Sequence, residues 1–359
     1  MSLKPAFKNV HSKFKFNNLS FNREELKEVA YCLVKEGLPF EQSIGDFLID
    51  WLNDKTHVEV QTSGTTGTPK TIRLDKQHMV NSAIATGNFF KINPGDSALH
   101  CLPSKFIAGK MMLVRAMILG LEIDVVPPSS NPLDKIDSTY DFCAMVPLQV
   151  QNSITRLHHI KKLIIGGAKA SNDLIQKIQG IPVEAYETYG MTETITHIAA
   201  KKLNHFKDQK EKLNAAFKTL PGVLIKTDDR NCLIIDVPKV SDKKIITNDV
   251  VEIISENTFH WLGRYDNIIN SGGIKLIPEQ IESKLTGIIK GRFFVTSKKD
   301  KQLGEKLVLV VEGANNSEEE LLDKIKKLNT ISKYEIPKEI LFSDHLKTTK
   351  NGKIIRSLE

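Results

Sequence analysis

The sequence contains few of the features that mark secreted, metal-binding or membrane proteins. Only four cysteines occur in 359 residues, and they are far apart without a Cys-x-x-Cys pair, which excludes a disulfide framework and a zinc knuckle. The most apolar stretch, 111–126, is interrupted by Arg115, Glu122 and Asp124 and is shorter than the roughly 18 uncharged residues of a membrane span. The N-terminal segment is lysine-rich without an apolar run, so no signal peptide is expected. These absences predict a cytoplasmic protein without a membrane span.

The sequence also lacks a segment in which basic side chains gather. Fifty Lys and Arg against 43 Asp and Glu give a formal net charge of +7, but the excess is spread along the chain. A nucleic-acid-binding surface would concentrate it on one element. We therefore expect no nucleic-acid partner and scattered sites for anionic small molecules. The composition is that of a folded globular protein, and the length suggests two domains.

Short β-rich runs alternate with segments of helical period between residues 58 and 189. This alternation predicts an α/β fold with mainly parallel sheets flanked by helices, in which ligands bind at loops that follow the strands. From residue 222 paired strands predict an antiparallel β annex, and a small α+β pattern begins after Gly263. We predict a large N-terminal domain over 1–263 and a small C-terminal domain over 264–359.

A loop rich in glycine and hydroxyl side chains follows the first of these strands. It reads Thr62-Ser63-Gly64-Thr65-Thr66-Gly67-Thr68-Pro69-Lys70. The glycines allow close backbone approach, the hydroxyls donate hydrogen bonds and Lys70 adds a cation, a combination that suits a polyphosphate. It is not a Walker A loop, because Pro69 replaces a glycine and has no N–H to donate. An exposed Gly/Thr turn is the alternative.

This loop resembles the phosphate-binding signature of the adenylate-forming superfamily, which includes acyl- and aryl-CoA ligases. Two later strings are similar to family motifs in the same order: Tyr189-Gly190-Met191-Thr192-Glu193 matches Tyr-Gly-x-Thr-Glu, and Gly263-Arg264-Tyr265-Asp266 matches Gly-Arg-x-Asp. Between them, Thr247-Asn248-Asp249 stands where the family has Thr-Gly-Asp, a departure at Asn248.

The resemblance continues to the end of the chain. Gly272-Gly273-Ile274-Lys275 precedes 278–282 as in the family, and Thr349-Lys350-Asn351-Gly352-Lys353, with Arg356 beyond, resembles the segment that bears the family's catalytic lysine. On composition alone, that lysine-rich tail is typical of a frayed terminus. Because the motifs span residues 62–356 in the family's order, the chain is identified as a member of this superfamily.

The resemblance implies a role for each motif in the large domain. Residues 62–67 and Lys70 would hold the phosphates of ATP, and Gly166-Gly167-Ala168 would let adenine and the acyl group lie against the backbone. Tyr189 and Gly190 would adjoin adenine, Thr192 would donate to the α-phosphate, and Glu193 would hold Mg²⁺. Asp249 and Arg264 would bind the ribose hydroxyls. Considered singly, Tyr189 and Glu193 could be a packed tyrosine and a structural glutamate.

The implied reaction has two steps: a carboxylate attacks ATP to give acyl-AMP and pyrophosphate, and a thiol, usually coenzyme A, then displaces AMP. Lys353 would stabilise the charge that develops in the first step. The small domain would then turn about Asp266, so that Gly272, Gly273 and Lys275 line the pantetheine path. We expect Lys353→Ala to lose adenylation but to retain thioester formation from supplied acyl-AMP.

The identity of the carboxylate depends on a finer resemblance. About 60 residues precede the phosphate loop, fewer than in most of the family, and segments 103–115 and 270–276 resemble compact o-succinylbenzoate–CoA ligases of menaquinone synthesis. Because that substrate has a second carboxylate, a cation is expected in the acyl pocket, with Lys105 or Lys110 as candidates; both could instead be exposed lysines at a helix end.

Three alternatives remain open: another aryl- or acyl-CoA ligase, a stand-alone adenylation protein that loads a carrier domain, and a non-catalytic nucleotide-binding module. The presence of Lys70, Glu193 and Lys353 disfavours the last. The partners expected are ATP, a small carboxylate and coenzyme A, and the sequence does not decide whether the chain forms a homo-oligomer.

Overall fold

The computed structural model describes residues 5–61, 71–313, 317–348 and 354–358. It divides into two compact units, Met1–Leu224 with Asp236–Ile245 and Ile225–Ile235 with Ile246–Glu359. This division assigns most of the strands predicted as an annex of the large domain to the second unit. The boundary predicted near residue 264, which separates parts expected to move independently, stays a prediction.

A mainly parallel sheet forms the centre of the first unit. Its strands follow the order β11-β10-β9-β8-β7-β5-β6-β1-β2. Strands β6, β5, β7, β8 and β9 pair in parallel, whereas β10 runs antiparallel to β9. The predicted α/β architecture is therefore confirmed. The bounds are β1 Lys15–Phe16, β2 Leu19–Ser20, β5 Ser97–His100, β6 Glu122–Val125, β7 Tyr140–Met145, β8 Ile160–Ile165, β9 Glu184–Gly190, β10 His197–Lys202 and β11 Phe217–Thr219.

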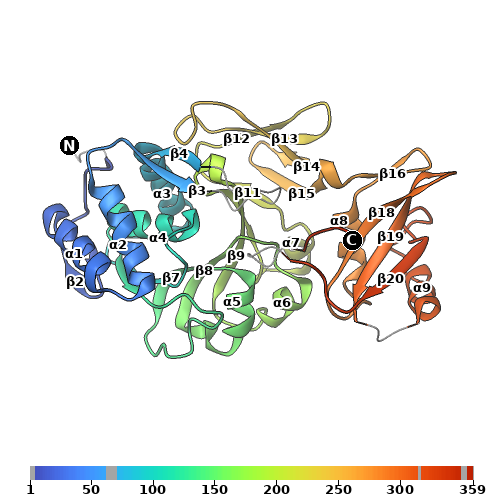
Figure 1. Ribbon diagram of the computed structural model, residues 1–359, viewed down its shortest axis with the longest axis horizontal. Helices are drawn as coiled ribbons and strands as arrows, with labels where there is room; N and C mark the ends of the chain where they lie inside the picture. The colour runs from blue at the N-terminus through green and yellow to red at the C-terminus, as the bar shows by residue number, and fades with distance from the viewer. Residues whose placement is uncertain (1–4, 62–70, 314–316, 349–353, 359) are drawn as a thin grey trace. The chain divides into compact units, whose positions relative to one another are not determined.

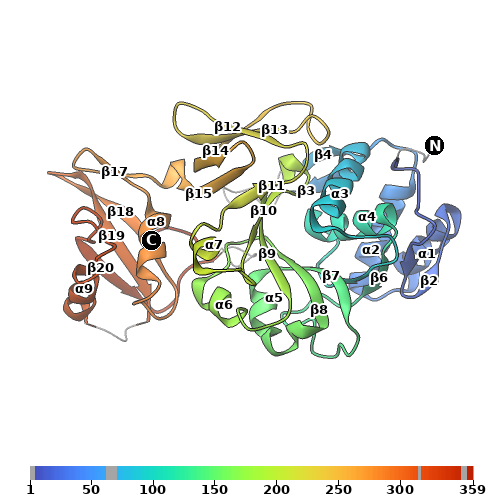
Figure 2. The same ribbon diagram turned by 180° about the vertical axis from the view of Figure 1, so that it is seen from behind.

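Helices cover both faces of this sheet. Phe90 of α3 contacts Phe142 and Tyr186 on one face, while the neighbouring Cys143 packs on the other face in a core that includes residues of α5 and α6. Figures 1 and 2 show α5 and α6 below these strands and α3 with α4 above them. The helices are α1 Arg23–Glu36, α2 Pro39–Leu52, α3 Lys76–Phe90, α4 Ile107–Leu119, α5 Pro147–Asn152, α6 Asn172–Lys177 and α7 Gln209–Leu213, with short 3₁₀ helices η1 Ile154–His159 and η2 Thr192–Thr194.

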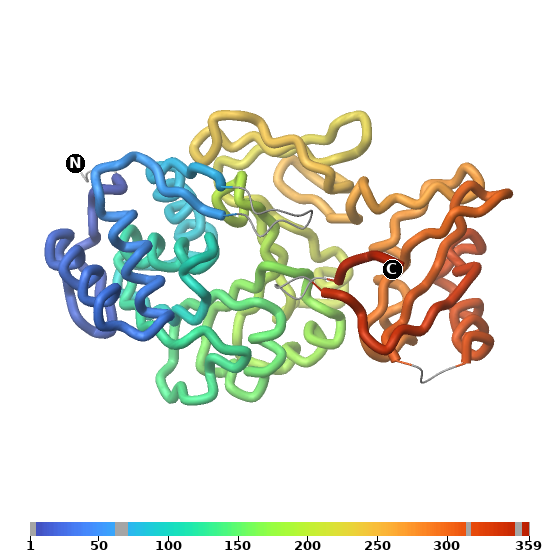
Figure 3. Tube along the Cα trace, viewed as in Figure 1, coloured from blue at the N-terminus to red at the C-terminus, as the bar shows by residue number. Residues whose placement is uncertain are grey.

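Helix α4 is buried on all sides. Residues 109–118 of this helix are all buried, as expected for an apolar helix enclosed by its neighbours. It packs along α3, and α1 packs along α2 at the N-terminal end of the chain (Figure 3). Two of the buried residues of α4, Lys110 and Arg115, are nevertheless cationic. Their burial requires an explanation, because a desolvated charge is costly unless it is paired.

A separate pair of antiparallel strands flanks the glycine-rich loop. Strands β3 (His57–Gln61) and β4 (Thr71–Asp75) pair along their full length, from His57 with Asp75 to Gln61 with Thr71. The side chain of Asp75 then caps α3 by accepting hydrogen bonds from the backbone N–H groups of Gln77 and His78. The predicted phosphate-binding residues Thr62, Ser63, Gly64, Thr65, Thr66, Gly67 and Lys70 lie outside the described residues.

The second unit contains two sheets. The first has the order β12-β13-β14-β15, and the second has β17-β16-β19-β18 with β20 parallel to β19. Helices α8 and α9 cover one face of the second sheet around Ile281, Leu285, Leu321 and Ile325. The bounds are β12 Leu224–Thr227, β13 Cys232–Asp236, β14 Ile245–Ser255, β15 Thr258–Arg264, η3 Tyr265–Asn267, β16 Ile269–Ser271, β17 Ile274–Leu276, α8 Pro278–Leu285, β18 Phe293–Asp300, β19 Gly304–Glu312, α9 Glu318–Lys326 and β20 Glu339–Ser343.

Helix α8 begins at Pro278, and Ser317 caps α9 by accepting a hydrogen bond from Glu320 N–H at 3.1 Å. In the described part of the chain, each helix falls short of the length and apolar character needed to cross a bilayer.

Candidate active site

The structure brings together two of the predicted motifs at the carboxyl ends of β8 and β9. Gly166 directly follows β8, and Tyr189 and Gly190 end β9. The hydroxyl of Thr188 donates to Ile165 O at 3.0 Å, and a Cβ atom on Gly166 would lie 2.8 Å from that hydroxyl oxygen. The segment 166–168 therefore begins beside the end of β9, the edge at which parallel sheets bind ligands.

A buried ion pair, absent from the sequence predictions, supports this edge. Glu187 is 4% exposed; it accepts a hydrogen bond from Ala170 N–H at 2.8 Å and pairs with Lys201 Nζ at 2.6 Å. The Lys201 ammonium lies 4.8 Å from the ring centre of Phe217, which is 5.8 Å from the ring of Tyr189. Glu187 thus joins the loop after β8 to the surroundings of Tyr189. The sequence signal that could have identified Glu187 as a site residue was its position two residues before the Tyr-Gly motif.

The loop after β9 holds Thr192 and Glu193 in a tight, strained turn. Thr194 is buried, and its hydroxyl contacts the carbonyl oxygens of Met191 and Thr196 at 2.9 and 2.6 Å. Ile195 has φ 65°, a left-handed conformation that is unfavourable for a β-branched side chain. Gly190 is required here, since a Cβ atom would lie 2.2 Å from Thr196 O. The turn leaves Glu193 exposed and directs the chain back along β9 as the antiparallel strand β10.

Glu193 fits a Mg²⁺ site completed by substrate. Its side chain is exposed, and the described residues contain no cluster of three or more His, Cys, Asp or Glu side chains that could hold a metal by themselves. Magnesium in nucleotide-binding enzymes is commonly held by one or two carboxylates together with phosphate oxygens. A single exposed carboxylate beside a strand end matches that requirement.

A buried polar cluster lies between α4 and the loop after β9. Arg115 is 1% exposed; its guanidinium reaches only Thr196 Oγ1 at 3.5 Å and Met112 Sδ at 3.8 Å, and its Nε has no acceptor among the described residues. His197 also belongs to this cluster, where its Nε2 lies 3.3 Å from Thr86 Oγ1. No carboxylate of the described residues pairs with Arg115, so the cluster holds an uncompensated positive charge.

Burial shifts the pKa values of this cluster toward the neutral forms. It lowers the pKa of Arg115 to about 9, which leaves the guanidinium charged at neutral pH. Burial, with a smaller contribution from Arg115, lowers the pKa of His197 well below its ordinary value. The cluster therefore combines a cationic guanidinium, a neutral imidazole and two hydroxyls, which suits an anionic ligand with hydrogen-bond acceptors.

The lysines predicted for the acyl pocket lie in different surroundings. Lys110 is 9% exposed and its ammonium lies 4.7 Å from the ring centre of Phe47 in α2; burial lowers its pKa, although Asp50 and Asp46 oppose that shift. Lys105 is exposed and lies over the ring of Phe106 at 5.1 Å. Their role in substrate binding stays a prediction. Arg115 was not predicted as a site residue from the sequence, although its charge within the apolar stretch 111–126 was a visible signal.

The second unit brings together Asp249, Arg264 and Asp266. Asp249 and Arg264 lie directly opposite each other on β14 and β15, with 3.5 Å between Arg264 Nη1 and Asp249 Oδ1. Asp249 is buried and also accepts a hydrogen bond from Trp261 Nε1 at 3.1 Å. Arg264 Nη2 reaches Asp266 Oδ2 at 3.2 Å. The paired carboxylate and guanidinium predicted to bind ribose are therefore neighbours.

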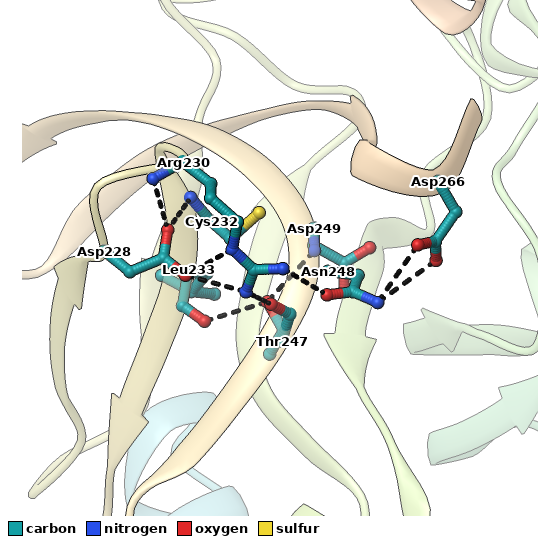
Figure 4. Close-up of polar contacts among 8 residues, drawn as sticks. All are labelled: Asp228, Arg230, Cys232, Leu233, Thr247, Asn248, Asp249 and Asp266. Atoms are coloured by element: carbon teal, nitrogen blue, oxygen red, sulfur yellow. Dashed lines mark hydrogen bonds and ion pairs between the residues drawn. The ribbon is translucent and has the colours of Figure 1, made fainter. Parts of the chain in front are cut away.

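Further polar contacts extend from these residues across β14 (Figure 4). Asn248 donates to both carboxylate oxygens of Asp266 at 3.2 Å and accepts from Arg230 Nη1 at 3.0 Å. Asp228 accepts from Arg230 Nε and Nη2 at 2.9 and 2.7 Å. None of the turn residues 228–231 was predicted to take part, because a β-turn rich in Asp, Arg and Asn is ordinarily a solvated loop.

The remaining predicted residues lie on the second sheet of that unit or outside the described part. Gly272 and Gly273 form the turn between β16 and β17 with φ values of 58° and 82°, and Lys275 on β17 is exposed. Lys353 lies outside the described residues. Arg356 is described: it pairs with Glu282, donates to Val295 O at 2.9 Å and lies 3.5 Å from Glu279 Oε1.

Comparison with known proteins places this site in a family. The family model described as "AMP-binding enzyme" matches residues 58–233. A crystal structure of an acyl-CoA synthetase (AMP-forming)/AMP-acid ligase II-like protein from Dyadobacter fermentans is 36% identical, covers 92% of this chain and 96% of its own, and gives a TM-score of 0.62.

More distant relatives carry a more specific name. The 2-succinylbenzoate–CoA ligase of Lactococcus lactis is 25% identical over 86% of this chain and 71% of its own length. The o-succinylbenzoate CoA synthetase of Bacillus subtilis, solved with an acyl-adenylate intermediate, is 22% identical over 83% of this chain and 67% of its own, with a TM-score of 0.72, and supports the fold. By the family match and the 36% identical relative, the chain belongs to the AMP-binding enzyme family.

Proposed function

We propose that this protein is an AMP-forming acid–thiol ligase that converts o-succinylbenzoate to its coenzyme A thioester, a step of menaquinone synthesis. A carboxylate oxygen of the substrate attacks the α-phosphorus of ATP, and pyrophosphate leaves. The sulfur of coenzyme A then attacks the acyl carbon, and AMP leaves. Relatives named as 2-succinylbenzoate–CoA ligases support the substrate. Because ATP and coenzyme A are cytoplasmic metabolites, we place the reaction in the cytoplasm.

The observation that carries this proposal is the Arg115 cation, which has no anionic partner among the described residues. A buried charge without a partner destabilises a protein, and Arg115 finds no carboxylate among the described residues. o-Succinylbenzoate has two carboxylates, of which only one reacts, so the second is available to pair with the guanidinium. Thr196, which contacts Arg115, lies three residues after Glu193. That spacing would place the unreactive end of the substrate in the cluster and the reactive end near the metal.

The residues at the strand ends would bind the nucleotide. Tyr189 and Gly190, with Gly166, Gly167 and Ala168, would hold adenine at the edge of the first sheet. Thr192 would donate to the α-phosphate and Glu193 would hold Mg²⁺, which offsets the negative charge of the phosphates. Thr62, Ser63, Gly64, Thr65, Thr66, Gly67 and Lys70 would hold the phosphates, as proposed from their sequence.

The second unit would supply the ribose contacts and the residues of the second step. Asp249 would accept both ribose hydroxyls with Arg264 beside it. We propose that residues 264–359 turn about Asp266 between the two steps, replacing Lys353 with the pantetheine path formed by Gly272, Gly273 and Lys275. In that case, Lys353→Ala blocks adenylation and retains thioester formation from supplied acyl-AMP.

The test is a substrate panel with purified protein, ATP, Mg²⁺ and coenzyme A. The acids are o-succinylbenzoate, benzoate, a monomethyl ester of o-succinylbenzoate at the unreactive carboxylate, and a medium-chain fatty acid, with AMP and acyl-CoA quantified by mass spectrometry. We expect o-succinylbenzoyl-CoA to form at least tenfold faster than any other thioester. Preference for the ester or for benzoate would refute the substrate. Release of pyrophosphate without any thioester would instead favour a carrier protein as the thiol donor.

A further inference from the structure

The side-chain amide of Asn248 is bound at both ends by charged groups. Its oxygen accepts a hydrogen bond from the guanidinium of Arg230 at 3.0 Å, and its nitrogen donates to the carboxylate of Asp266 at 3.2 Å to each oxygen. Figure 4 shows this amide between the turn after β12 and the segment after β15. An amide held between a cation and an anion has one favourable orientation, so its two hydrogen bonds reinforce each other.

Arg230, which donates to the oxygen of the amide, is itself held by several contacts. Asp228 accepts two hydrogen bonds from the Arg230 guanidinium and also accepts from the backbone N–H groups of Arg230 and Cys232 at 2.9 Å each. Arg230 Nη2 donates further to Thr247 O at 3.3 Å, and the guanidinium lies 5.1 Å from the ring centre of Tyr265. Arg230 is therefore a fixed donor for Asn248.

Asp266, which accepts from the nitrogen of the amide, lies in the short connection between the two sheets of the second unit. Only η3 (Tyr265–Asn267) and Ile268 lie between β15 and β16. Within that connection, Asp266 contacts Asn248 and Arg264, and Tyr265 lies beside Arg230. These contacts attach the connection to β14 and to the turn after β12.

This attachment depends on a residue that departs from the pattern of the resembled family. Asn248 stands at the place where the motif has glycine, and glycine has no side chain with which to join Arg230 to Asp266. Asn248 is half-buried and extends from β14, between the buried Thr247 and Asp249. Thr247 is held through its hydroxyl, which donates to Leu233 O at 2.8 Å. The backbone at Asn248 is thus anchored on both sides.

We propose that Asn248, held by Arg230, is a positioning residue for Asp266 that restrains the connection between β15 and β16. This inference rests on the proposed function only where it concerns catalysis. The connection contains the residue about which residues 264–359 would turn between adenylation and thioester formation. Fastening Asp266 to β14 therefore sets how readily that turn occurs and so the balance between the two half-reactions.

The restraint is measured first in the protein alone. Hydrogen–deuterium exchange of peptides covering 264–271 is compared for the full-length wild type, Asn248→Ala, Asn248→Asp and Arg230→Gln. Loss of the hydrogen bonds should speed exchange at Ile268, whose N–H donates to Tyr265 O at 3.2 Å, by about threefold to tenfold in Asn248→Ala. Asn248→Asp should exchange at least as fast, because it sets a second carboxylate against Asp266.

Asn257→Ala is the matched control, because it removes an asparagine side chain whose hydrogen bonds among the described residues go to Ser255 and Thr258 in the turn after β14. It should leave exchange over 264–271 unchanged. Equal exchange in wild type and Asn248→Ala, with both proteins folded by circular dichroism, would overturn the proposal. Equal acceleration by Asn257→Ala would overturn it too, since general loosening of the sheet would then explain the result.

The catalytic consequence is measured as a ratio. Pyrophosphate exchange reports adenylation, and thioester formation from supplied acyl-AMP reports the second step. We expect Asn248→Ala to change the ratio of these rates by at least threefold while the KM for ATP changes less than twofold. Faster exchange with an unchanged ratio would refute the link to catalysis. Failure of the wild type to adenylate any acid would refute the proposed function and leave the exchange result to decide the restraint.

Discussion

The Arg115 charge of the α4 cluster is buried without compensation from the described residues, whereas the Arg230 charge of the network in Figure 4 is partly exposed and is paired with Asp228. Arg115 has two weak contacts and no anion among the described residues. Arg230, by contrast, is held by Asp228, Asn248 and Thr247. Both groups contain arginine and hydroxyl-bearing or amide side chains, so composition does not separate them. What separates them is whether the protein itself supplies the opposite charge.

This difference indicates what each group does. A buried cation without an anion destabilises the protein and is explained when a ligand provides the anion. A partly exposed ion pair such as Arg230 with Asp228 contributes little to stability, so its main effect is to fix geometry. The first group is therefore a place to look for substrate recognition, and the second a place to look for control of position.

Arg115→Met should separate stability from activity and gives the largest expected effect. Removing an unpaired buried charge while retaining an apolar side chain should leave the free energy of unfolding unchanged or raise it by about 1–4 kcal/mol. The kcat/KM for o-succinylbenzoate should fall about 100-fold or more, the usual cost of leaving a ligand charge without its partner. Urea denaturation and steady-state kinetics measure both quantities.

The matched variant for that experiment is Lys110→Met, which removes the other cation buried in α4. If Lys110 takes no part in binding, its kcat/KM should change less than fivefold. A large loss in Lys110→Met with little loss in Arg115→Met would transfer the substrate contact to the lysine predicted from sequence. A strong loss of stability in Arg115→Met would show that the guanidinium has an anionic partner in the substrate-free protein.

Acid should destabilise the first unit before the second. Burial lowers the pKa of His100 to about 4 from 6.5 and that of His197 well below 6.5, so the unfolded chain binds protons first. The stability that these neutral histidines contribute to the folded first unit is fully present above pH 6.5 and is lost as the pH falls toward 4. The contribution of His100 is about 3 kcal/mol. In the second unit, hydrogen bonding to Arg292 lowers the pKa of Glu312 to about 2 from 4.5, so that contribution is lost only below pH 4.5.

Tryptophan fluorescence measures this difference, because the chain has two tryptophans. In Trp261→Phe the remaining Trp51, which is fully buried in α2, reports the first unit alone. The urea concentration at the unfolding midpoint should decrease as the pH is lowered from 6.5 to 4.5. In His100→Asn the midpoint should depend less on pH. Hydrogen exchange of β18 and β19 over the same range reports the second unit. Parallel losses in both units would remove the contrast between them.

Much of the fold follows from local patterns in the sequence. The α/β alternation and the small α+β pattern after Gly263 were predicted because strand and helix periodicity, caps and proline act over a few residues. The assignment of β12–β15 was less accessible. Whether the annex packs with the residues before it or after it depends on contacts between distant segments, which no local pattern encodes.

The residues of the candidate site also differ in whether a local sequence pattern predicts them. Motif residues such as Tyr189, Glu193 and Asp249 were predicted because they stand within recognisable strings. Arg115 and Glu187 were not predicted, since their significance lies in what surrounds them. Arg115 has no anion among the described residues, and Glu187 pairs with Lys201 on the neighbouring strand β10. Asn248 was noticed as a departure from a motif, but its two partners are 18 residues away in opposite directions along the chain.

A partly buried ion pair in the second unit tests whether compensation, rather than burial, decides stability. Arg356 and Glu282 form two contacts, and Glu282 also accepts from Val295 N–H at 2.7 Å. Glu282→Gln should lower the free energy of unfolding by about 2 kcal/mol, because it leaves a largely buried guanidinium with Glu279 Oε1, 3.5 Å away, as its remaining anion among the described residues. The double variant Glu282→Met with Arg356→Met should recover at least half of that loss in urea denaturation. Additive losses would contradict the role of compensation.

An exposed pair gives the smallest effect. Arg73 and Glu59 on β4 and β3 are 3.1 Å apart, with side chains 73% and 54% exposed. Arg73→Ala should change the free energy of unfolding by no more than about 0.5 kcal/mol, and thermal melts at low and high salt should agree within error. A decrease of more than 1 kcal/mol in the free energy of unfolding would show that exposed ion pairs in this protein stabilise it more than we infer for the network in Figure 4.

The guanidinium of Arg115, for which the part of the chain that the structure describes supplies no anion, also has a consequence for the lifetime of the protein. If a dicarboxylate supplies the missing charge, the substrate-bound form is the more stable one, by about 2.7 kcal/mol when the free ligand is at 100 times its Kd. Cellular proteases remove molecules in proportion to the fraction that is unfolded. The abundance of the enzyme would then follow the supply of its substrate without any change in gene expression.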